Sequence, residues 1–265
     1  MTEPRKFAVV TGASSGIGLE LARQFAQHDF DILITAEDDE LTSAADSLIG
    51  TGTVVQSVRA DLTDPAGVEQ LVAAITATGR PVDAIAINAG VGNGGAFVDI
   101  PLADEQRLLA LNVVSTVHLA KRVLPDMVRR GTGRVLFTAS VASTMPGPYY
   151  ATYAASKAFV LSFAEALRHE VKDAGVTVTA LMPGPTDTEF FGRAGMENTP
   201  VDSAKKDDAA KVAADGYAAL MSGKDRVVAG GRKNRLQTAT GKVLSEKVKA
   251  AIHARMTRPK ARSDA

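Results

Sequence analysis

Short apolar runs recur along the first two thirds of the chain, and they are nearly continuous in hydrophobic residues instead of alternating with polar ones. This pattern is typical of strands that are buried on both faces of a parallel sheet. It predicts six strands, at residues 7–11, 31–35, 54–59, 84–88, 134–138 and 177–181.

The segments between these strands have the apolar spacing of helices. Helices are expected at residues 18–27, 65–77, 104–128 and 153–171, and Pro125 should kink or end the third of them. The alternation predicts an α/β fold: a Rossmann-like, doubly wound parallel sheet with helices on both faces. No repeat or linker interrupts it, so we expect a single domain over residues 1–265, with a substrate lid at about 183–206.

Composition excludes several kinds of site. The 265 residues include no cysteine and four scattered histidines, so disulfides and thiolate nucleophiles are excluded, and no metal site is expected. No apolar run approaches the ~18 residues of a membrane span, and the first residues lack the apolar core of a secretory signal. We therefore expect a cytoplasmic protein without a membrane span.

The formal charge of zero is a cancellation between two parts of the chain. Residues 1–223 carry a net charge of −9 and residues 224–265 carry +9. Apolar positions within the tail predict a basic C-terminal helix at about 232–256. That helix could dock on the acidic body or a neighbouring subunit, lie on a membrane surface, or bind nucleic acid. The tail has no aromatic residue for base stacking, so nucleic acid is not expected.

Glycines follow the first predicted strand in the spacing T-G-x-x-x-G-x-G, over residues 11–18. Glycines let the backbone approach a pyrophosphate closely, and a helix N-terminus offers free N–H groups. The strand–loop–helix context favours a dinucleotide site over an ordinary glycine-rich turn.

Acidic residues follow the second predicted strand, about 20 residues beyond the glycine loop, where a carboxylate would bind the adenosine ribose and repel a 2′-phosphate. Glu37 and Asp38 occupy these positions. They favour NAD, with NADP less expected. The acidic run could also simply start a helix, where negative charge suits the helix dipole.

Of the four tyrosines, only Tyr153 has a lysine, Lys157, four residues further on. On a helix these two side chains share a face. An ammonium within ~4–6 Å stabilises phenolate and brings the phenol pKa, ≈ 10 when free, closer to working pH. The pair therefore predicts proton transfer, although an isolated pair of this spacing is often only an exposed helix contact.

The ordered set of motifs resembles the short-chain dehydrogenase/reductase family, in its single-domain branch, over roughly residues 6–230. Besides the glycine loop and Tyr153–Lys157, the matching residues are Asp61, Asn88-Ala89-Gly90, Asn112, Ser140 and Pro183-Gly184, all at strand ends or on the adjoining helices. The resemblance implies a Rossmann-like fold and an NAD(P)-dependent short-chain alcohol dehydrogenase or carbonyl reductase. Such an enzyme transfers a hydride between nicotinamide and a secondary alcohol or ketone.

The resemblance also implies roles for individual residues. Tyr153 is expected to be the general acid/base, while Lys157 lowers its pKa and binds the nicotinamide ribose. Ser140 should hydrogen-bond the substrate oxygen, and Asn112 should hold a water that links Lys157 to solvent. The residues expected to bind the dinucleotide are Gly12, Ser14, Ser15, Gly16, Ile17, Gly18, Glu37, Asp38, Asp61, Leu62, Asn88, Ala89, Gly90, Tyr153, Lys157, Pro183, Gly184, Thr186 and Thr188.

The expected substrate walls are residues 91–97, residues 141–150 and the lid around residues 185–196. Their apolar side chains suit an apolar or aromatic alcohol or carbonyl compound, unless they only pack the lid against the body. The apolar residues in question are Phe97, Val141, Met145, Tyr149, Phe190, Phe191 and Met196. A catalytically silent, dinucleotide-binding redox sensor is the alternative function, but a sensor would be expected to have lost the tyrosine or the lysine. The resemblance further implies a homodimer or homotetramer that pairs the helices at 104–130 and 153–172.

Overall fold

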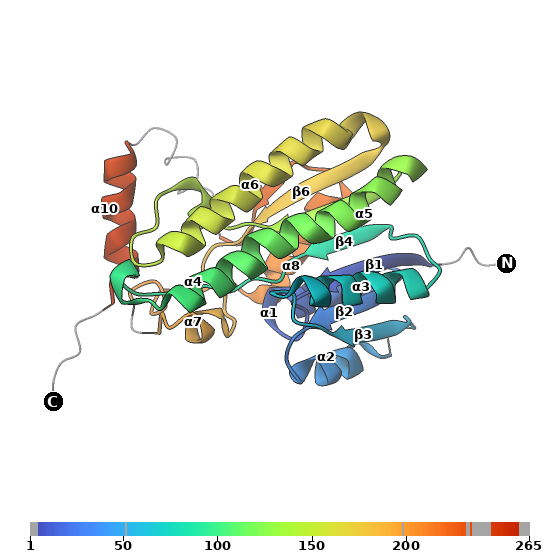
Figure 1. Ribbon diagram of the computed structural model, residues 1–265, viewed down its shortest axis with the longest axis horizontal. Coiled ribbons are helices and arrows are strands. Elements are labelled where there is room, and N and C mark those ends of the chain that lie inside the picture. The colour runs from blue at the N-terminus through green and yellow to red at the C-terminus, as the bar shows by residue number, and fades with distance from the viewer. Residues whose placement is uncertain (1–4, 51, 198, 232–233, 235–244, 260–265) are drawn as a thin grey trace.

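The protein, seen here as a computed structural model, has a seven-stranded, all-parallel sheet with strand order β3-β2-β1-β4-β5-β6-β7 (Figure 1). The structure describes residues 5–50, 52–197, 199–231, 234 and 245–259. The strands are β1 (Lys6–Thr11), β2 (Phe30–Ala36), β3 (Val55–Arg59), β4 (Ala84–Ile87), β5 (Gly133–Thr138), β6 (Val176–Met182) and β7 (Arg226–Val228). The expected doubly wound α/β fold is confirmed, with one strand more than the apolar pattern indicated.

Helices cover both faces of the sheet. The longer ones are α1 (Gly16–Gln27), α2 (Glu40–Leu48), α3 (Pro65–Ala77), α4 (Leu102–Leu109), α5 (Thr116–Arg130), α6 (Ala151–Val171), α8 (Ala209–Met221) and α10 (Glu246–Thr257). The short helical segments are η1 (Phe97–Asp99), η2 (Ala110–Ser115), η3 (Val141–Thr144), η4 (Lys172–Ala174) and α7 (Phe190–Arg193). Helices α3, α5 and α6 form one core layer with the sheet, and α1, α2 and α8 form the other.

The helix expected at 104–128 is divided. A π-helical segment, η2, separates α4 from α5, and α5 continues through Pro125 as far as Arg130. The proline therefore does not end the helix. Strand β3 lies at the sheet edge and its side chains are only partly buried or exposed, so the expectation of burial on both faces is wrong for this strand.

The basic C-terminal helix is only partly described. Helix α10 covers the second half of the expected 232–256 range, whereas residues 232–233 and 235–244 lie outside the described residues. Figure 1 shows α10 at one end of the molecule, near the start of α6.

The position of the site follows from the strand order. The chain leaves β1 toward β2 on one side, while β4 lies on the other side of β1. In open α/β sheets, ligands bind at such a switch point, beyond the carboxyl ends of the strands. The ends of β1 and β4 carry the glycine loop and Asn88-Ala89-Gly90.

Candidate active site

In the glycine loop, the backbone of Gly12 lies directly against that of Ala89, and Gly18 lies directly against Gly12. Gly12 and Gly16 have φ values of +64° and +54°, which glycine adopts without strain. A Cβ on Gly12 would lie 2.8 Å from Ala89 Cα, and a Cβ on Gly18 would clash with the carbonyl oxygen of Gly12. Only glycine fits these positions. Helix α1 then begins with no acidic residue in its first turn, so its positive end is open to an anion.

Hydrogen bonds fix the ends of β1, β4 and β5 to one another. Thr11 Oγ1 accepts from the backbone N–H groups of Asn88 and Ala89, at 2.9 and 3.0 Å. Asn88 Nδ2 donates to Thr11 O, and Thr138 Oγ1 donates to Asn88 Oδ1 at 2.9 Å. Asn88 therefore has a structural position in the site, joining three strand ends.

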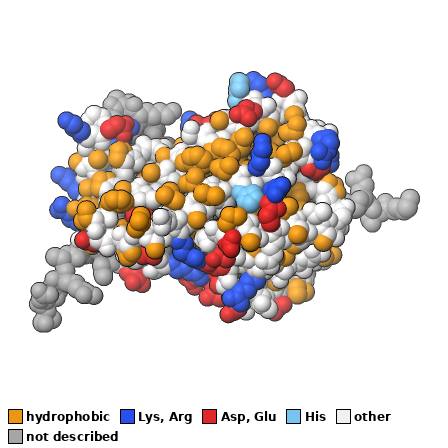
Figure 2. Space-filling view, in the orientation of Figure 1, with side chains coloured by type: hydrophobic (Ala, Val, Ile, Leu, Met, Phe, Trp, Pro, Cys, Tyr) orange, Lys and Arg blue, Asp and Glu red, His pale blue; other side chains and the backbone are white. Residues whose placement is uncertain are grey.

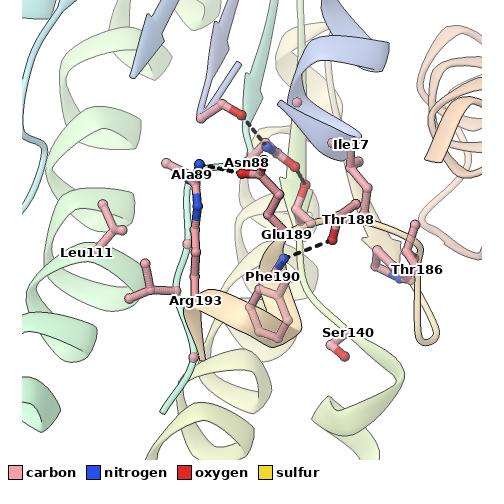
Figure 3. Close-up of a pocket in the computed structure, with 18 of the residues that line it drawn as sticks. Ile17, Asn88, Ala89, Leu111, Ser140, Thr186, Thr188, Glu189, Phe190 and Arg193 are labelled. Carbon is pink, nitrogen blue, oxygen red and sulfur yellow. Dashed lines mark hydrogen bonds and ion pairs between the residues drawn. The ribbon is translucent and has the colours of Figure 1, made fainter. Parts of the chain in front are cut away.

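A long pocket runs along these strand ends. Every residue expected to bind the dinucleotide lines it, from Gly12 and Asp38 at one end to Tyr153 and Thr188 at the other. Figure 3 shows part of this lining, with Asn88 and Ala89 facing Thr188 and Phe190 across the pocket.

Asp38 is held in place at the adenosine end. Its Oδ2 accepts from Ser14 Oγ at 2.9 Å and lies 3.6 Å from Arg193 NH1. Its Oδ1 is buried and has no hydrogen-bond partner within the described part of the chain. An acceptor in this position fits the hydroxyl donors of a ribose, so the pocket passes this test for a dinucleotide.

Glu37 makes a different contact. It pairs with Arg107 of α4 at 2.5 Å, and the same guanidinium lies 3.5 Å from Asp61. Burial would raise the pKa of Asp61, but hydrogen bonds from Thr63 and the charge of Arg107 outweigh it and lower this pKa. The acidic run also starts helix α2, at Glu40, so both interpretations of the run agree with the structure.

Ser140, Tyr153 and Lys157 meet at the opposite end of the pocket. Ser140 ends the loop after β5, and Tyr153 and Lys157 lie on α6; the three residues are 8%, 8% and 5% exposed. Lys157 Nζ donates to Thr138 O at 2.8 Å and lies 5.9 Å from the centre of the Tyr153 ring. A Cβ on Gly90 would come within 3.0 Å of Lys157 Nζ, so Gly90 leaves space for the lysine.

Burial dominates the pKa values of this pair. It raises the pKa of Tyr153 to about 12, against a smaller lowering by a hydrogen bond with Ser140. It lowers the pKa of Lys157 to about 8. The expected net lowering of the Tyr153 pKa is thus not found in the free protein, where burial outweighs the hydrogen bond with Ser140. The buried ammonium is directed at Thr138 O, and its own charged form is destabilised.

Asn112 does not line the pocket but lies behind it. Within η2, its Oδ1 accepts from Val91 N at 3.0 Å, and its Nδ2 donates to Val91 O and Ser156 Oγ at 2.9 and 3.0 Å. The side chain is thus occupied in fixing Val91, in the loop that follows β4. π-Helical turns are frequent at functional sites, and this one aims Asn112 between β4 and α6.

The segment after β6 closes the pocket on its outer side. A Cβ on Gly16 would lie 2.8 Å from Thr188 Cγ2, so this segment touches the glycine loop. Asp207 holds its base, because Asp207 N donates to Pro185 O and Asp187 N donates to Asp207 O, each at 2.8 Å. Phe190 N donates to Thr188 Oγ1 at 3.3 Å (Figure 3). The Phe190 ring lies 5.2 Å from that of Tyr153.

A family model described as short chain dehydrogenase matches residues 6–198, well over half of the chain. The chain belongs to the short-chain dehydrogenase/reductase family. Oxidoreductase UcpA of Salmonella typhimurium is 34% identical over 198 residues, which cover 74% of this chain and 75% of that relative.

Solved members of the short-chain dehydrogenase/reductase family have the same fold. One from Sphingobium yanoikuyae, in complex with NADPH, is 29% identical with a TM-score of 0.79, over 90% of this chain and 94% of the other. Another, from Burkholderia phymatum and in complex with NAD, is 26% identical with a TM-score of 0.79, over 94% and 96%. Both solved proteins are oxidoreductases of the short-chain dehydrogenase/reductase family, as this chain is. Members of the family bind NAD or NADP. No described helix of this chain is long and apolar enough to cross a membrane.

At the substrate end, only some of the expected apolar wall residues line the pocket. Val141, Phe190 and Phe191 line the pocket, whereas Phe97, Met145, Tyr149 and Met196 do not. Phe97 is 63% exposed, and Met196 is fully buried in a cluster with Tyr153. For Met196, packing of the lid against the body was the correct interpretation.

Tyr150, at the end of the expected wall 141–150, also lines this end, and so does Val201, which the expected walls did not include. Tyr150 immediately precedes α6, and its ring stacks on that of Tyr153, with centres 5.3 Å apart. Val201 lies in the segment expected as a lid, where no local pattern distinguishes wall residues from packing residues.

Proposed function

We propose that this oxidoreductase uses NAD to interconvert a secondary alcohol and a ketone that carries an apolar or aromatic group. One observation carries the proposal. A buried tyrosine, lysine and serine converge at one end of a pocket whose other end has a glycine loop and a carboxylate with a free acceptor oxygen.

The glycine loop and the N-terminus of α1 would hold the pyrophosphate, and Asp38 would bind the adenosine ribose. Lys157 would bind the nicotinamide ribose, and Thr188 would contact the carboxamide. When bound, the dinucleotide supplies or accepts the hydride. The chain supplies the binding, the orientation and the proton.

Tyr153 would donate a proton from its phenol oxygen to the substrate oxygen as the ketone is reduced, and would take it back in alcohol oxidation. Its raised pKa, about 12, keeps the phenol protonated at neutral pH, which suits the donor role. Ser140 would hydrogen-bond the same substrate oxygen. Asn112 would fix the loop after Gly90, at Val91, against which the nicotinamide end packs, and hold the water that links Lys157 to solvent.

NAD is favoured over NADP because Asp38 and Glu37 bring negative charge to the position that a 2′-phosphate would occupy. Arg193 and Arg107 are close by, but each is already paired with carboxylates. Related structures hold either dinucleotide, so this preference rests on the residues of this chain.

Nicotinamide absorbance, followed with purified protein and a panel of apolar and aromatic ketones and alcohols, tests the proposal. NAD(H) and NADP(H) are run in parallel, with competitive binding of the two. We expect turnover with at least one panel member and tighter binding of NAD(H). Dinucleotide binding without turnover of any substrate would contradict the oxidoreductase proposal and favour the redox sensor.

A further inference from the structure

Helix α10 lies beyond residue 198, where the family match ends, yet it contacts two segments that border the substrate end of the pocket. Thr257 Oγ1 donates to Pro148 O at 2.7 Å. Val201 N donates to Met256 O at 2.9 Å. The helix therefore joins the loop that precedes α6 to the lid.

His253 is the residue through which α10 contacts the pocket lining. Its side chain is 4% exposed, with Nδ1 2.7 Å from Pro146 O and Nε2 2.8 Å from the Tyr150 hydroxyl. A carbonyl oxygen only accepts, so Nδ1 carries a proton. Burial lowers the pKa of His253 and favours the neutral ring, whose Nε2 then accepts the hydroxyl proton of Tyr150.

Tyr150 is therefore held both at its hydroxyl, by His253, and at its ring, by Tyr153. Its ring is 8% exposed and lies nearly parallel to the Tyr153 ring, at an interplanar angle of 12°. The preceding residue, Tyr149, has a φ of +64°, which is strained for an aromatic side chain. Arg258 Nε donates to the Tyr149 hydroxyl at 2.7 Å and so helps to hold this turn from the end of α10.

We infer that His253 is a positioning residue, which holds Tyr150 from α10 as a fixed wall of the substrate compartment beside the Tyr153 hydroxyl. This inference rests on the proposed function, because it assigns Tyr150 to the substrate wall. Because the Tyr150 hydroxyl donates its proton to His253, it has none left to donate to a substrate carboxylate. The neighbouring wall residues Val141, Phe191 and Val201 are apolar. This wall therefore suits an uncharged apolar or aromatic substituent and disfavours a carboxylate.

Steady-state kinetics of full-length variants with NAD(H) and the best ketone of the panel tests this role. His253→Phe keeps an aromatic ring but leaves the buried Tyr150 hydroxyl without its acceptor, so KM should rise about tenfold. Since the dinucleotide site and Tyr153 are retained, kcat and the Kd for NAD(H) should stay within about twofold. His253→Gln, whose amide can donate to Pro146 O and accept from Tyr150, should restore most of the KM.

Thr257→Val is the matched control, because it removes a hydrogen bond between α10 and the same loop without touching Tyr150. Its KM should equal that of the wild type. Tyr150→Phe removes the same contact from the other partner and should raise KM as His253→Phe does, which keeps the test open if one variant does not fold. An unchanged KM in both, or an equal rise in Thr257→Val, would overturn the inference.

Hydrogen–deuterium exchange over residues 146–153, with NAD(H) present, gives a second test that needs no turnover. His253→Phe should speed exchange in this segment relative to wild type and to Thr257→Val. If the wild type reduces no substrate but this difference appears, the proposed function fails while the positioning of Tyr150 by His253 stands. Equal exchange in all three proteins overturns the positioning itself.

Discussion

Tyr153 and Lys157 are both buried, and burial moves their pKa values in opposite directions, each toward the neutral form. A neutral phenol next to a substrate oxygen is a proton donor without a competing water shell. This arrangement makes the phenol oxygen the single atom on which the proposed chemistry depends.

Tyr153→Phe should therefore lower kcat by roughly 100- to 10,000-fold, the usual contribution of a general acid or base. The ring still packs against Phe190 and Tyr150, so the Kd for NAD(H) should change little. Single-turnover absorbance and equilibrium titration measure the two quantities. A variant that keeps more than about a tenth of the wild-type kcat would remove Tyr153 from the mechanism.

Lys157 should give the stability of the free protein a characteristic pH dependence. Its folded pKa of about 8 lies below the 10.5 of a free lysine, so between these values the unfolded chain binds a proton that the folded chain does not. The free energy of unfolding then rises with pH across this window. Between pH 8 and pH 10 the wild type should gain roughly 2–3 kcal/mol relative to Lys157→Met.

Urea unfolding at several pH values measures this difference. Lys172→Met, at an exposed lysine of η4, is the control and should leave the pH dependence unchanged. The comparison stops at pH 10 because Tyr153 has the opposite effect on the free energy of unfolding at higher pH. There the folded protein keeps the Tyr153 proton that the unfolded chain loses, so the free energy of unfolding falls as pH rises. A constant difference between wild type and Lys157→Met would show that Lys157 is charged in the folded protein.

Asp38→Ser should weaken NAD binding about tenfold, because a charge-assisted contact to the ribose hydroxyls is lost. It should weaken NADP binding less or strengthen it, since the carboxylate that would face the 2′-phosphate is removed. Asp39→Ser removes the same charge one residue away, from a side chain that pairs with Arg59 outside the pocket. Equal effects of the two substitutions on both dinucleotides would assign the preference to net charge instead of to Asp38.

At the scale of the elements, the π-helical segment η2 determines the position of Asn112. The extra residue in this turn lets the Asn112 side chain make three hydrogen bonds, two to Val91 and one to Ser156. Asn112 itself is only 1% exposed. Asn112 therefore couples η2 to the loop after β4, at Val91, and to α6, at Ser156.

Asn112→Ala should lower the free energy of unfolding by about 2–3 kcal/mol, because it removes three hydrogen bonds and leaves the N–H and C=O of the partly buried Val91 without these partners. Ser115→Ala, in the same segment, removes only a hydrogen bond within the helix, to Leu111 O, and should cost less than about 1 kcal/mol. Denaturant midpoints of the two variants give the comparison. Similar losses in both would mean that the contacts of Asn112 to Val91 add no more stability than an ordinary hydrogen bond within a helix.

The apolar pattern located the six longer strands to within one residue at each end. For all of them except β3, burial of most side chains leaves little polar content to obscure the pattern. It missed β7, which has only three residues, and it could not indicate η2, since a single π turn leaves the helical spacing almost unchanged. The glycine loop and the tyrosine–lysine pair could be located because local spacing defines them. Contacts between Tyr150 and His253, 103 residues apart, have no local signal.

For the molecule as a whole, attraction between the acidic body and the basic tail contributes less to the docking of α10 than the composition suggested. Within the described residues, the ion pair found for α10 joins Lys249 to Glu246 of the same helix. The helix contacts the body instead through His253, Thr257 and Met256, and through Arg258 on Tyr149. Hydrogen bonds and packing thus hold the described part of the tail, and salt should affect this docking little.

The face formed by α4, η2, α5 and α6 is the remaining large-scale feature. Figure 2 shows hydrophobic side chains gathered over α5 and α6. Val114 in η2 and Phe159 in α6 are 54% and 39% exposed. These are the helices that the family resemblance led us to expect in an interface. Apolar side chains left in water on two neighbouring helices favour burial against a second copy of the same face.

We therefore expect the wild type to elute as a dimer or tetramer, and the double variant Val114→Lys with Phe159→Lys to elute as a smaller species. Lysines on both sides of a two-fold interface would meet their own copies, and this repulsion adds to the lost apolar burial. Size-exclusion chromatography with light scattering measures the mass directly. Ile49→Lys, at a 68% exposed position beyond α2, introduces the same side chain off this face and should leave the mass unchanged. An oligomer that survives the double variant would place the interface on another surface.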